Sequence, residues 1–514
     1  MTRDKVKNTQ NLDEIREIAL NLFDENKILQ EQIKSLHIRL FGRKSEKSSK
    51  DDGQLSLFEI PEPELSILEK PETVNIAEHK RKKRGRKPLP ADLPRIDVIH
   101  ELSEGERQCN CGCLKAHIGQ EVSEQLDYVP AKVRVIRNIR YKYACKNCEG
   151  VENDGPTVSI ARMPDQIIPK SIATPGLLAH ILTAKFADAL PFYRQEKQFS
   201  RIGIELCRST MCNWGMKVAD ACSLIISMMK DDILANAMIG IDETPLQVLK
   251  SPRKSKSYMW VFRGGPPGKP IVLFEYHPTR SGDAASQFLK NYQGIVQTDG
   301  YAGYDFLDAK KDILHVGCWV HARRKFKEVT KVVGNKKGTS GNAGTALKYI
   351  SKLYKIERDA RQQGWSAEQL YSQRQSLAVP ILDEFKKWLD ARVEKIPPKS
   401  LLGKAVNYTL GQWNRLIQYT NNGIIRPDNN LVENAIRPFV VGRKNWLFSG
   451  TPHGAHASAA VYSLIETAKA CGLEPYRYLK YLFTNLPEAM SVDDFQSLLP
   501  YSIEKKVLAD PVAS

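Results

Sequence analysis

Three short runs of apolar and aromatic residues, separated by segments rich in Gly, Pro and Ser, form the clearest pattern in the middle of the chain. They span 239–248, 258–263 and 270–277. Runs of this length between turn-forming residues predict antiparallel strands joined by hairpins. Apolar residues at helical spacing follow at 281–292, and the run 294–298 predicts a fourth strand.

This order of elements predicts an α/β core. Three antiparallel strands, a crossover helix and a parallel strand follow the order of the ribonuclease-H-like fold, in which the first and fourth strands lie side by side. A further helix at 303–310 and a strand at 313–319 continue the pattern. We therefore expect a multidomain α/β protein with a ribonuclease-H-like core.

Acidic residues stand at two of the predicted strand ends and at one predicted helix start. Asp242 ends the apolar run 237–242, Asp299 ends the run 294–299, and Glu433 lies near the start of a predicted helix. Carboxylates at the ends of neighbouring strands, with a third on a facing helix, can hold two metal ions that act on both oxygens of a phosphoryl transfer. Hard oxygen ligands suit Mg²⁺ or Mn²⁺ rather than zinc.

Each of these acids has a structural alternative. Asp and Glu are common at strand ends and helix starts, where they cap the backbone or face water. Glu243 competes with Asp242 as a ligand, but side chains alternate along a strand, which sends the two to opposite faces. Helical spacing places Glu433 and Arg437 on one face. That suits a metal ligand beside a phosphate-binding cation, or a surface ion pair worth about a few tenths of a kcal/mol.

The stretch between Asp299 and Glu433 is far longer than one helix and a loop require. Its apolar spacing predicts four helices, at 346–361, 367–377, 381–393 and 400–419. We interpret residues 326–422 as an all-α insertion, which either contacts DNA or acts as a spacer.

Several motifs together carry a resemblance to a known family. They are Gly240–Pro245, Gln297–Tyr301, Cys318–Phe326, and Asn430–Pro438 with Gly442–Trp446. In them the chain resembles the transposases of the insertion sequence 66 family, members of the DDE superfamily, and the resemblance covers almost the whole chain. It implies a DNA transposase that binds the terminal inverted repeats of its element and catalyses metal-dependent 3′-end cleavage and strand transfer into target DNA. It also implies that the catalytic acids are Asp242, Asp299 and Glu433, with two Mg²⁺ or Mn²⁺ ions.

Basic and aromatic residues after Glu433 have expected roles in holding DNA. Arg437, Arg443 and Lys444 are expected to bind phosphate. Trp446 either stacks on a base or packs in the core.

A Cys-x-x-His pair, Cys318 and His321, lies at the end of the predicted fifth strand. Zinc is one interpretation, yet no second ligand pair lies near them in sequence. We therefore expect the pair to shape the active site, with His321 near the scissile phosphate and Arg323 and Arg324 on the DNA backbone. A core cysteine beside a surface histidine is the structural alternative.

Five of the ten cysteines cluster in two groups, a pattern typical of a four-thiolate zinc site. They are Cys109, Cys111, Cys113, Cys145 and Cys148. The first group offers three candidates for two places, and we favour Cys109 with either Cys111 or Cys113. Strand-like segments at 126–129 and 133–142 lie between the groups. A structural Zn²⁺ is expected here, with free thiols or a degenerate site as the alternative.

The N-terminal region has apolar residues at alternating spacings of three and four. The seam consists of Leu12, Ile15, Ala19, Leu22, Asn26, Leu29, Ile33, Leu36 and Leu40. This heptad pattern predicts a leucine zipper, and a polar Asn at an a position favours a parallel pair. Dimerisation through about four heptads is therefore expected; a helix packed on its own chain is the alternative.

A linker rich in Pro, Ser, Lys and Glu follows the zipper and contains a strongly basic run at 79–88. Its core, with Arg84 and Arg86, is similar to an AT-hook, whose Arg side chains enter the minor groove. A solvated basic linker is the alternative. Either way, contact with DNA that does not depend on sequence is expected.

Residues 191–218 predict a helix-turn-helix. The first helix is expected at 193–199, the turn at 201–204 and the second helix at 207–218. The residues expected to face the major groove are Arg208, Ser209, Thr210 and Asn213. Many helical hairpins share this pattern without touching DNA.

Composition agrees with a nucleic-acid partner. The chain of 514 residues has 76 Lys and Arg against 59 Asp and Glu, a formal net charge of +17. Such an excess attracts phosphate and makes binding salt-dependent. No apolar run approaches the roughly 20 residues needed to cross a bilayer, and the N-terminus lacks a signal-peptide core. We therefore expect a cytoplasmic, nucleoid-associated prokaryotic protein that binds double-stranded DNA, works without a membrane, and pairs with a second copy and with small companion proteins of the element.

The expected domains follow in order along the chain. They are the zipper (1–45), basic linker (46–100), zinc module (101–155), helix-turn-helix region (160–230), first core part (231–325), helical insertion (326–422), second core part with Glu433 (423–455) and a C-terminal helical region (456–514). Two other functions remain open: a zipper and zinc DNA-binding regulator without catalysis, and a ribonuclease-H-like nuclease that cuts without joining.

Overall fold

The computed structural model describes residues 12–41, 133–144, 158–160, 163–251, 256–266, 268–333 and 341–508. The chain divides into two compact units, residues 1–61 with 164–514, and residues 62–163. In the smaller unit, β1 (Lys142–Ala144) pairs antiparallel with β2 (Val158–Ile160). The strand expected at 133–142 is wrong over 133–141, which are exposed and in no strand. Pairing begins only at Lys142, where β2 lies opposite.

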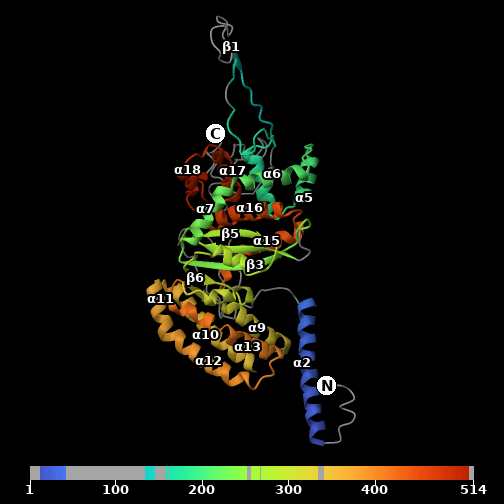
Figure 1. Ribbon diagram of the computed structural model, residues 1–514, viewed down its shortest axis with the longest axis vertical. Coiled ribbons are helices and arrows are strands. Elements are labelled where there is room, and N and C mark those ends of the chain that lie inside the picture. Colours follow the sequence, from blue (N-terminus) through green and yellow to red (C-terminus); the bar gives the residue numbers. More distant parts are fainter. Residues whose placement is uncertain are drawn as a thin grey trace, which may run out of the picture. The chain divides into compact units, whose positions relative to one another are not determined.

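A five-stranded mixed sheet lies at the centre of the larger unit, in the order β5-β4-β3-β6-β7 (Figure 1). The strands are β3 (Met238–Leu246), β4 (Ser257–Gly264), β5 (Ile271–His277), β6 (Gly294–Gln297) and β7 (Ile313–Val316). β3, β4 and β5 pair antiparallel, whereas β6 runs parallel to both β3 and β7. The predicted strands, and the predicted contact between the first and the fourth of them, are confirmed.

The connections differ in detail from the expected helices. The crossover helix α8 spans only Asp283–Phe288, and the helix expected at 303–310 is a 3₁₀ helix, η1 (Ala302–Ala309). The strand expected at 313–319 ends at Val316, where its pairing with β6 ends. The backbone N–H groups of Gly317 and Trp319 donate to residues outside the sheet, Gly317 N–H to Arg415 O and Trp319 N–H to Pro427 O. Helix α9 (Trp319–Val333) therefore begins at Trp319.

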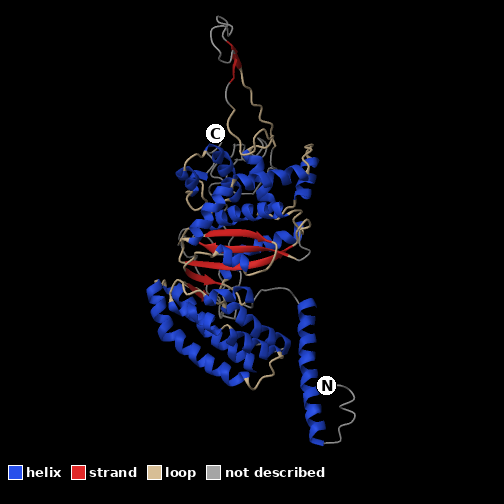
Figure 2. Ribbon diagram, viewed as in Figure 1, coloured by secondary structure: helices blue, strands red, loops and turns tan. Residues whose placement is uncertain are grey.

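Helices cover both sides of the sheet (Figure 2). Four helices precede the strands of the sheet in the sequence: α4 (Pro175–Phe186), α5 (Phe192–Arg201), α6 (Arg208–Ala221) and α7 (Ser223–Leu234). After the insertion come α15 (Asn430–Trp446), α16 (Pro452–Ala470), α17 (Pro475–Asn485), η4 (Leu486–Glu488), α18 (Val492–Ser497) and η5 (Lys505–Leu508). The expected helices of the helix-turn-helix and of the C-terminal region are confirmed; α4 and α7 were not predicted.

Helix α16 closes the outer edge of the sheet. The backbone N–H groups of Val272 and Phe274 on β5 donate to Thr467 Oγ1 and Ser463 Oγ, at 2.9 and 2.8 Å. Edge strands otherwise offer unpaired donors to other chains, so these hydroxyls replace a missing strand.

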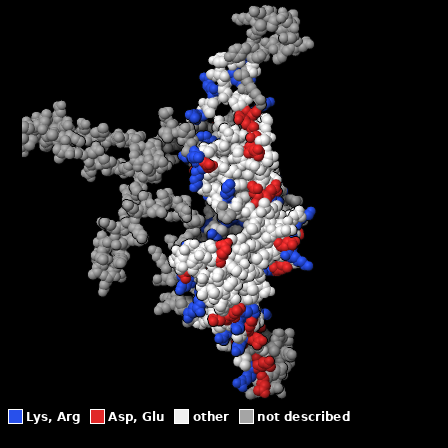
Figure 3. Space-filling model, turned by 90° about the vertical axis from the view of Figure 1, so that its left-hand side faces the viewer, with Lys and Arg blue, Asp and Glu red and all other residues white. Residues whose placement is uncertain are grey.

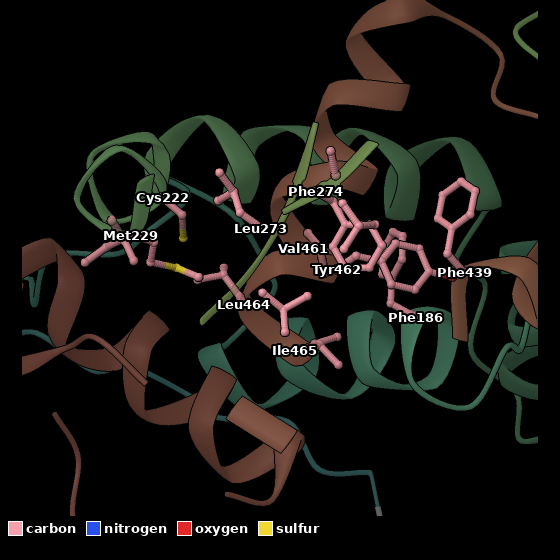
Figure 4. Close-up of a cluster of buried hydrophobic side chains, with 14 of the residues drawn as sticks. Phe186, Cys222, Met229, Leu273, Phe274, Phe439, Val461, Tyr462, Leu464 and Ile465 are labelled. Carbon is pink, nitrogen blue, oxygen red and sulfur yellow. The ribbon is translucent and has the colours of Figure 1, made fainter. Parts of the chain in front are cut away.

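An aromatic cluster joins α15, α16 and β5 (Figure 4). The ring centroid of Tyr462 lies 5.0 Å from that of Phe186, 5.2 Å from that of Phe439 and 5.4 Å from that of Phe274. All four side chains are buried. Edge-to-face and tilted ring pairs at these distances stabilise a core beyond the area that they bury. The cluster fixes α15 against the sheet.

The residues between β7 and α15 form a separate helical unit with its own core. After α9 it contains α10 (Gly341–Gln363), α11 (Ala367–Gln373), the π-helix η2 (Arg374–Ala378), α12 (Val379–Val393), α13 (Leu401–Gly411), α14 (Trp413–Leu416) and the 3₁₀ helix η3 (Ile417–Asn421). The helices expected at 346–361 and 381–393 are confirmed, whereas the one expected at 367–377 ends in the π-helix η2 and the one expected at 400–419 is divided into α13, α14 and η3. Buried Arg374 forms an ion pair with Glu357 and donates to the carbonyls of Tyr419, Asn422 and Ile425.

The N-terminal helix α2 (Leu12–Phe41) contacts α9 and α13. Most of the expected heptad seam faces away from the chain, since Leu22, Leu29 and Leu36 are each more than half exposed. Among the helices that the structure describes, none combines the length and the apolar character needed to cross a bilayer.

Candidate active site

The pairing of β3 with β6 and the packing of α15 on β3 bring three acidic residues to one region. Asp242 lies on β3, Asp299 lies two residues beyond the end of β6, and Glu433 lies in the first turn of α15. The α15 end is tied to β3 because Asn429 Nδ2 donates to Ile241 O at 3.0 Å.

Gly240 allows α15 to approach β3 this closely. A β-carbon at this position would lie 2.4 Å from Val432 Cγ2 and 2.8 Å from Asn429 Oδ1. Carbon atoms in contact prefer a separation of about 3.5–4.0 Å. Glycine at 240 therefore sets the distance between the strand of Asp242 and the helix of Glu433.

The carboxylates in this region repel one another. Burial raises the pKa of the Asp242 carboxyl well above its usual range, and the charges of Glu243, Asp299 and Glu433 raise it further. The pKa of Glu433 is also raised, chiefly by burial, with Arg324 acting in the opposite direction. Glu433 Oε1 is buried and has no hydrogen-bond partner within the part of the chain that the structure describes. A divalent cation would neutralise these charges, so the donor set fits Mg²⁺ or Mn²⁺.

Glu243 is engaged on the other side of the sheet. Its carboxylate accepts hydrogen bonds from Arg280, whose Nε lies at 2.8 Å and Nη2 at 2.6 Å, and from the hydroxyl of Tyr304 on η1. The predicted alternation between Asp242 and Glu243 is confirmed. The Glu243 carboxylate is thus bound by Arg280 and Tyr304 on the face of the sheet opposite Asp242.

A chain of polar side chains ends at Asp299, whose backbone carbonyl accepts from Thr298 Oγ1 at 2.8 Å. His315 on β7 is buried, with Nε2 at 2.8 Å from Thr298 Oγ1 and Nδ1 at 2.7 Å from Asp308 Oδ1. Asp308 in turn accepts from Arg415. These residues come from separate elements of the chain, and only the folded structure brings them together, so no local sequence pattern indicates them.

Cys318 and His321 lie beside Glu433. Cys318 follows β7 in a loop and His321 lies in the first turn of α9, not at a strand end as expected. The ligand atoms of Cys318, His321 and Glu433 all lie within 4.8 Å of one another. His321 Nδ1 is 3.8 Å from Glu433 Oε1, and Arg324 Nη2 is 3.6 Å from Glu433 Oε2. Glu433 lies 112 positions beyond His321 in the sequence. For this reason the sequence alone indicated no further ligand for Cys318 and His321.

The basic residues expected to hold phosphate are distributed around α15 and α9. Arg443 Nη1 donates to Thr244 Oγ1 on β3 at 3.1 Å, and Lys444 is exposed. Arg437 lies close enough to lower the pKa of Glu433. Arg323 lies on α9, next to Arg324, whose side chain is about half exposed.

Trp446 packs edge-to-face on Phe439, with ring centroids 5.3 Å apart. It belongs to the partly buried shell of the main core. Of the two interpretations offered by the sequence, this geometry supports packing.

The helix-turn-helix residues lie at the start of α6. Arg208, Ser209 and Asn213 are exposed and Thr210 is partly exposed. The backbone N–H of Arg208 donates to Glu196 Oε1 on α5 at 3.0 Å, which ties the two helices together. The geometry leaves this helix end open to solvent.

Other predicted site residues lie outside the described residues. They are Arg84, Arg86, Cys109, Cys111, Cys113, Cys145 and Cys148. On the face shown in Figure 3, lysine and arginine side chains are spread along the molecule with acidic side chains among them.

Family models match along the chain. Residues 170–457 match "Transposase IS66 family", 28–98 match "Transposase C of IS166 homeodomain", 106–149 match "zinc-finger binding domain of transposase IS66" and 463–501 match "IS66 C-terminal element". The first of these models covers more than half of the chain and includes all three acids.

Similar proteins occur in Sinorhizobium fredii. The uncharacterized protein y4jD is 34% identical over 430 residues, covering 80% of this chain and 81% of its own length. The uncharacterized protein y4qI is 29% identical over 469 residues, covering 88% of this chain and 84% of its own. These relatives share most of their length with the chain but carry no described activity in their names.

Proposed function

The chain belongs to the IS66 family of transposases, and from this premise we propose that it cuts and joins DNA at the ends of its own insertion sequence. It binds the terminal inverted repeats, cleaves to release a 3′-hydroxyl at each end, and joins that hydroxyl to target DNA. The observation that carries the proposal is the meeting of Asp242, Asp299 and Glu433 at β3, β6 and α15.

The core is proposed to be ribonuclease-H-like. The strand order β5-β4-β3-β6-β7, with β3–β5 antiparallel and β6 and β7 parallel to β3, supports this assignment. In such a core the first and fourth strands carry two of the acids and a later helix carries the third, as β3, β6 and α15 do here. Residues 341–421 then form an insertion between the second and third acids.

Asp242, Asp299 and Glu433 would hold two divalent ions, Mg²⁺ or Mn²⁺. When bound, such ions lower the pKa of a water molecule and stabilise the charge on the leaving oxygen. Backbone N–H groups hold two of the three carboxylates in the positions from which they would bind the ions. Asp299 Oδ1, for example, accepts from the N–H of Tyr301 at 3.0 Å.

The chain's own cations then place the DNA backbone against the acids. Arg324 lies 3.6 Å from Glu433 and is half exposed, so it can reach a phosphate beside the acids. Arg323, Arg437, Arg443 and Lys444 lie on the same two helices, α9 and α15. His321 adjoins Glu433 and is proposed to contact the scissile phosphate.

The remaining regions are proposed to select and pair the DNA ends. The exposed start of α6, with Arg208, Ser209 and Asn213, would enter the major groove. The zinc module and the AT-hook-like arm would add contacts, and the exposed apolar seam of α2 would pair two copies. We further propose that the protein acts at the nucleoid in the cytoplasm, together with small companion proteins.

A strand-transfer assay tests the proposal. Purified protein, Mg²⁺ and DNA carrying the element's own ends should give cleaved and joined products, and Asp299→Asn should abolish both. The matched control is Asp231→Asn, an exposed acid on α7 that should keep full activity. Cleavage without joining in the wild-type protein would point to a nuclease, and end binding without any reaction would point to a regulator.

A further inference from the structure

Cys318, His321 and Glu433 place three different ligand atoms around one point. The thiol, an imidazole nitrogen and a carboxylate oxygen lie within 4.8 Å of one another. Zinc binds such a set at about 2.3 Å for sulfur and about 2.0–2.2 Å for nitrogen and oxygen. Neighbouring nitrogen and oxygen ligands of a tetrahedral ion then lie about 3.3 Å apart. His321 Nδ1 and Glu433 Oε1 are at 3.8 Å, so a shift of about half an ångström brings these two atoms to ligand spacing. The Cys318 sulfur lies within 4.8 Å of the other two ligand atoms.

Two of these three atoms have unused binding capacity. His321 Nδ1 and Glu433 Oε1 are both buried, and neither has a hydrogen-bond partner among the described residues. A buried polar atom without a partner is costly, and such atoms in a native fold point to a missing water or ion. Here the two lie side by side and face the same thiol.

The third ligand is held in place beside the other two. Cys318 is 2% exposed, and the backbone N–H of Asn429 donates to its sulfur at 3.3 Å, which fixes the orientation of the side chain. Burial and the charges of Glu433 and Asp428 raise the pKa of the thiol, so the thiolate would need a bound cation. Asn429 also bonds β3 through its side chain, so the thiol is fixed relative to the acid cluster.

We propose that Cys318, His321 and Glu433 form a binding site for a thiophilic divalent ion such as Zn²⁺, which shares Glu433 with the Mg²⁺ or Mn²⁺ pair. On binding, the Cys318 thiol gives its proton to solvent and His321 binds through its neutral Nδ1. The thiolate and the Glu433 carboxylate then balance the two charges of the ion. Three protein ligands leave one position open, as in zinc sites that exchange their fourth ligand.

The site has a consequence for the acid cluster, and this part rests on the proposed function. Glu433 would be shared between the zinc site and the active-site ions. Zn²⁺ held by Cys318 and His321 would draw Glu433 toward α9 and away from Asp242. Occupation of the site by zinc would therefore slow DNA cleavage.

Zinc content of the full-length protein tests the site without any DNA. Wild type and variants are dialysed against a zinc buffer and their bound Zn²⁺ is measured per chain. Cys318→Ser should carry one equivalent less than wild type, and Glu433→Gln should bind the same equivalent at least about tenfold more weakly. The control is Cys222→Ser, since Cys222 is equally buried but lies between α6 and α7; it should match wild type.

The outcomes separate the zinc site from the proposed function. Equal zinc content in wild type, Cys318→Ser and Glu433→Gln would overturn the site, whatever the enzyme activity. Circular dichroism checks that each variant is folded; if Cys318→Ser is not, Glu433→Gln, which leaves the cysteine in place, decides. A lost equivalent in a protein that neither cuts nor joins DNA would support the site and count against the proposed transposase activity.

Discussion

Replacing Gly240 by alanine should loosen the contact between β3 and α15, on which the acid cluster depends. The new β-carbon would lie 2.4 Å from Val432 Cγ2, about 1 Å inside the preferred carbon contact distance. Forced overpacking of this kind costs about 1–3 kcal/mol. Loss of the bond from Asn429 Nδ2 to Ile241 O adds about 0.5–1.5 kcal/mol. We therefore expect Gly240→Ala to lower the free energy of unfolding by about 2–4 kcal/mol.

A double-mutant cycle with Val432 identifies the cause. Denaturant unfolding is followed by circular dichroism for Gly240→Ala, Val432→Ala and the double variant. Because Val432→Ala removes the clashing methyl group, the double variant should be more stable than the sum of the single effects by about 1 kcal/mol or more. Gly411→Ala is the control, since nothing lies within 4 Å of its β-carbon position. Additive effects, or a Gly240→Ala protein as stable as wild type, would refute the close approach.

Two further predictions concern buried charges. Burial and the neighbouring Glu243, Asp299 and Glu433 raise the pKa of Asp242 well above the 3.8 of a free side chain, so the folded state keeps a proton that the unfolded state loses. In metal-free buffer the free energy of unfolding should thus fall as pH rises from about 4 toward the raised pKa. Asp242→Asn should flatten this dependence of stability on pH, as measured in thermal melts. An unchanged dependence in the variant would contradict the burial of this charge. Arg374→Met should destabilise the helical insertion by about 3–5 kcal/mol, because it leaves Glu357 and three backbone carbonyls without their partner. Denaturant unfolding measures this loss. A loss of stability below about 1 kcal/mol would show that the hydrogen bonds of Arg374 are not needed.

Local sequence was sufficient to predict the strands. Segments of Gly, Pro and Ser separate β3, β4 and β5, and the expected strand order already placed the strand of Asp242 beside the strand of Asp299. Helices α4 and α7 escaped prediction because their apolar residues do not form one stripe. In α4, Leu178, Ala179, Ile181 and Leu182 are all buried, so the helical period is lost.

The parts of the site that could not be predicted from the sequence depend on contacts between distant segments. Glu433 joins Cys318 and His321 only because α15 packs on β3 beside the start of α9. Likewise, the α16 hydroxyls that close the edge of β5 come from Ser463 and Thr467, nearly 200 positions later. Trp446 could not be assigned from sequence either, because stacking on a base and packing on Phe439 need the same side chain.

Metal rescue of an acid variant tests the central claim most directly. A thiolate binds Mn²⁺ much better than Mg²⁺, because Mg²⁺ demands hard oxygen ligands. Asp299→Cys is assayed for cleavage and joining of the element's ends with each metal in turn. If Asp299 holds an active-site ion, products disappear in Mg²⁺ and return in Mn²⁺, whereas Asp299→Ala stays inactive in both. Equal activity of Asp299→Cys and wild type in Mg²⁺, or no difference between the cysteine and alanine variants in Mn²⁺, would contradict the account.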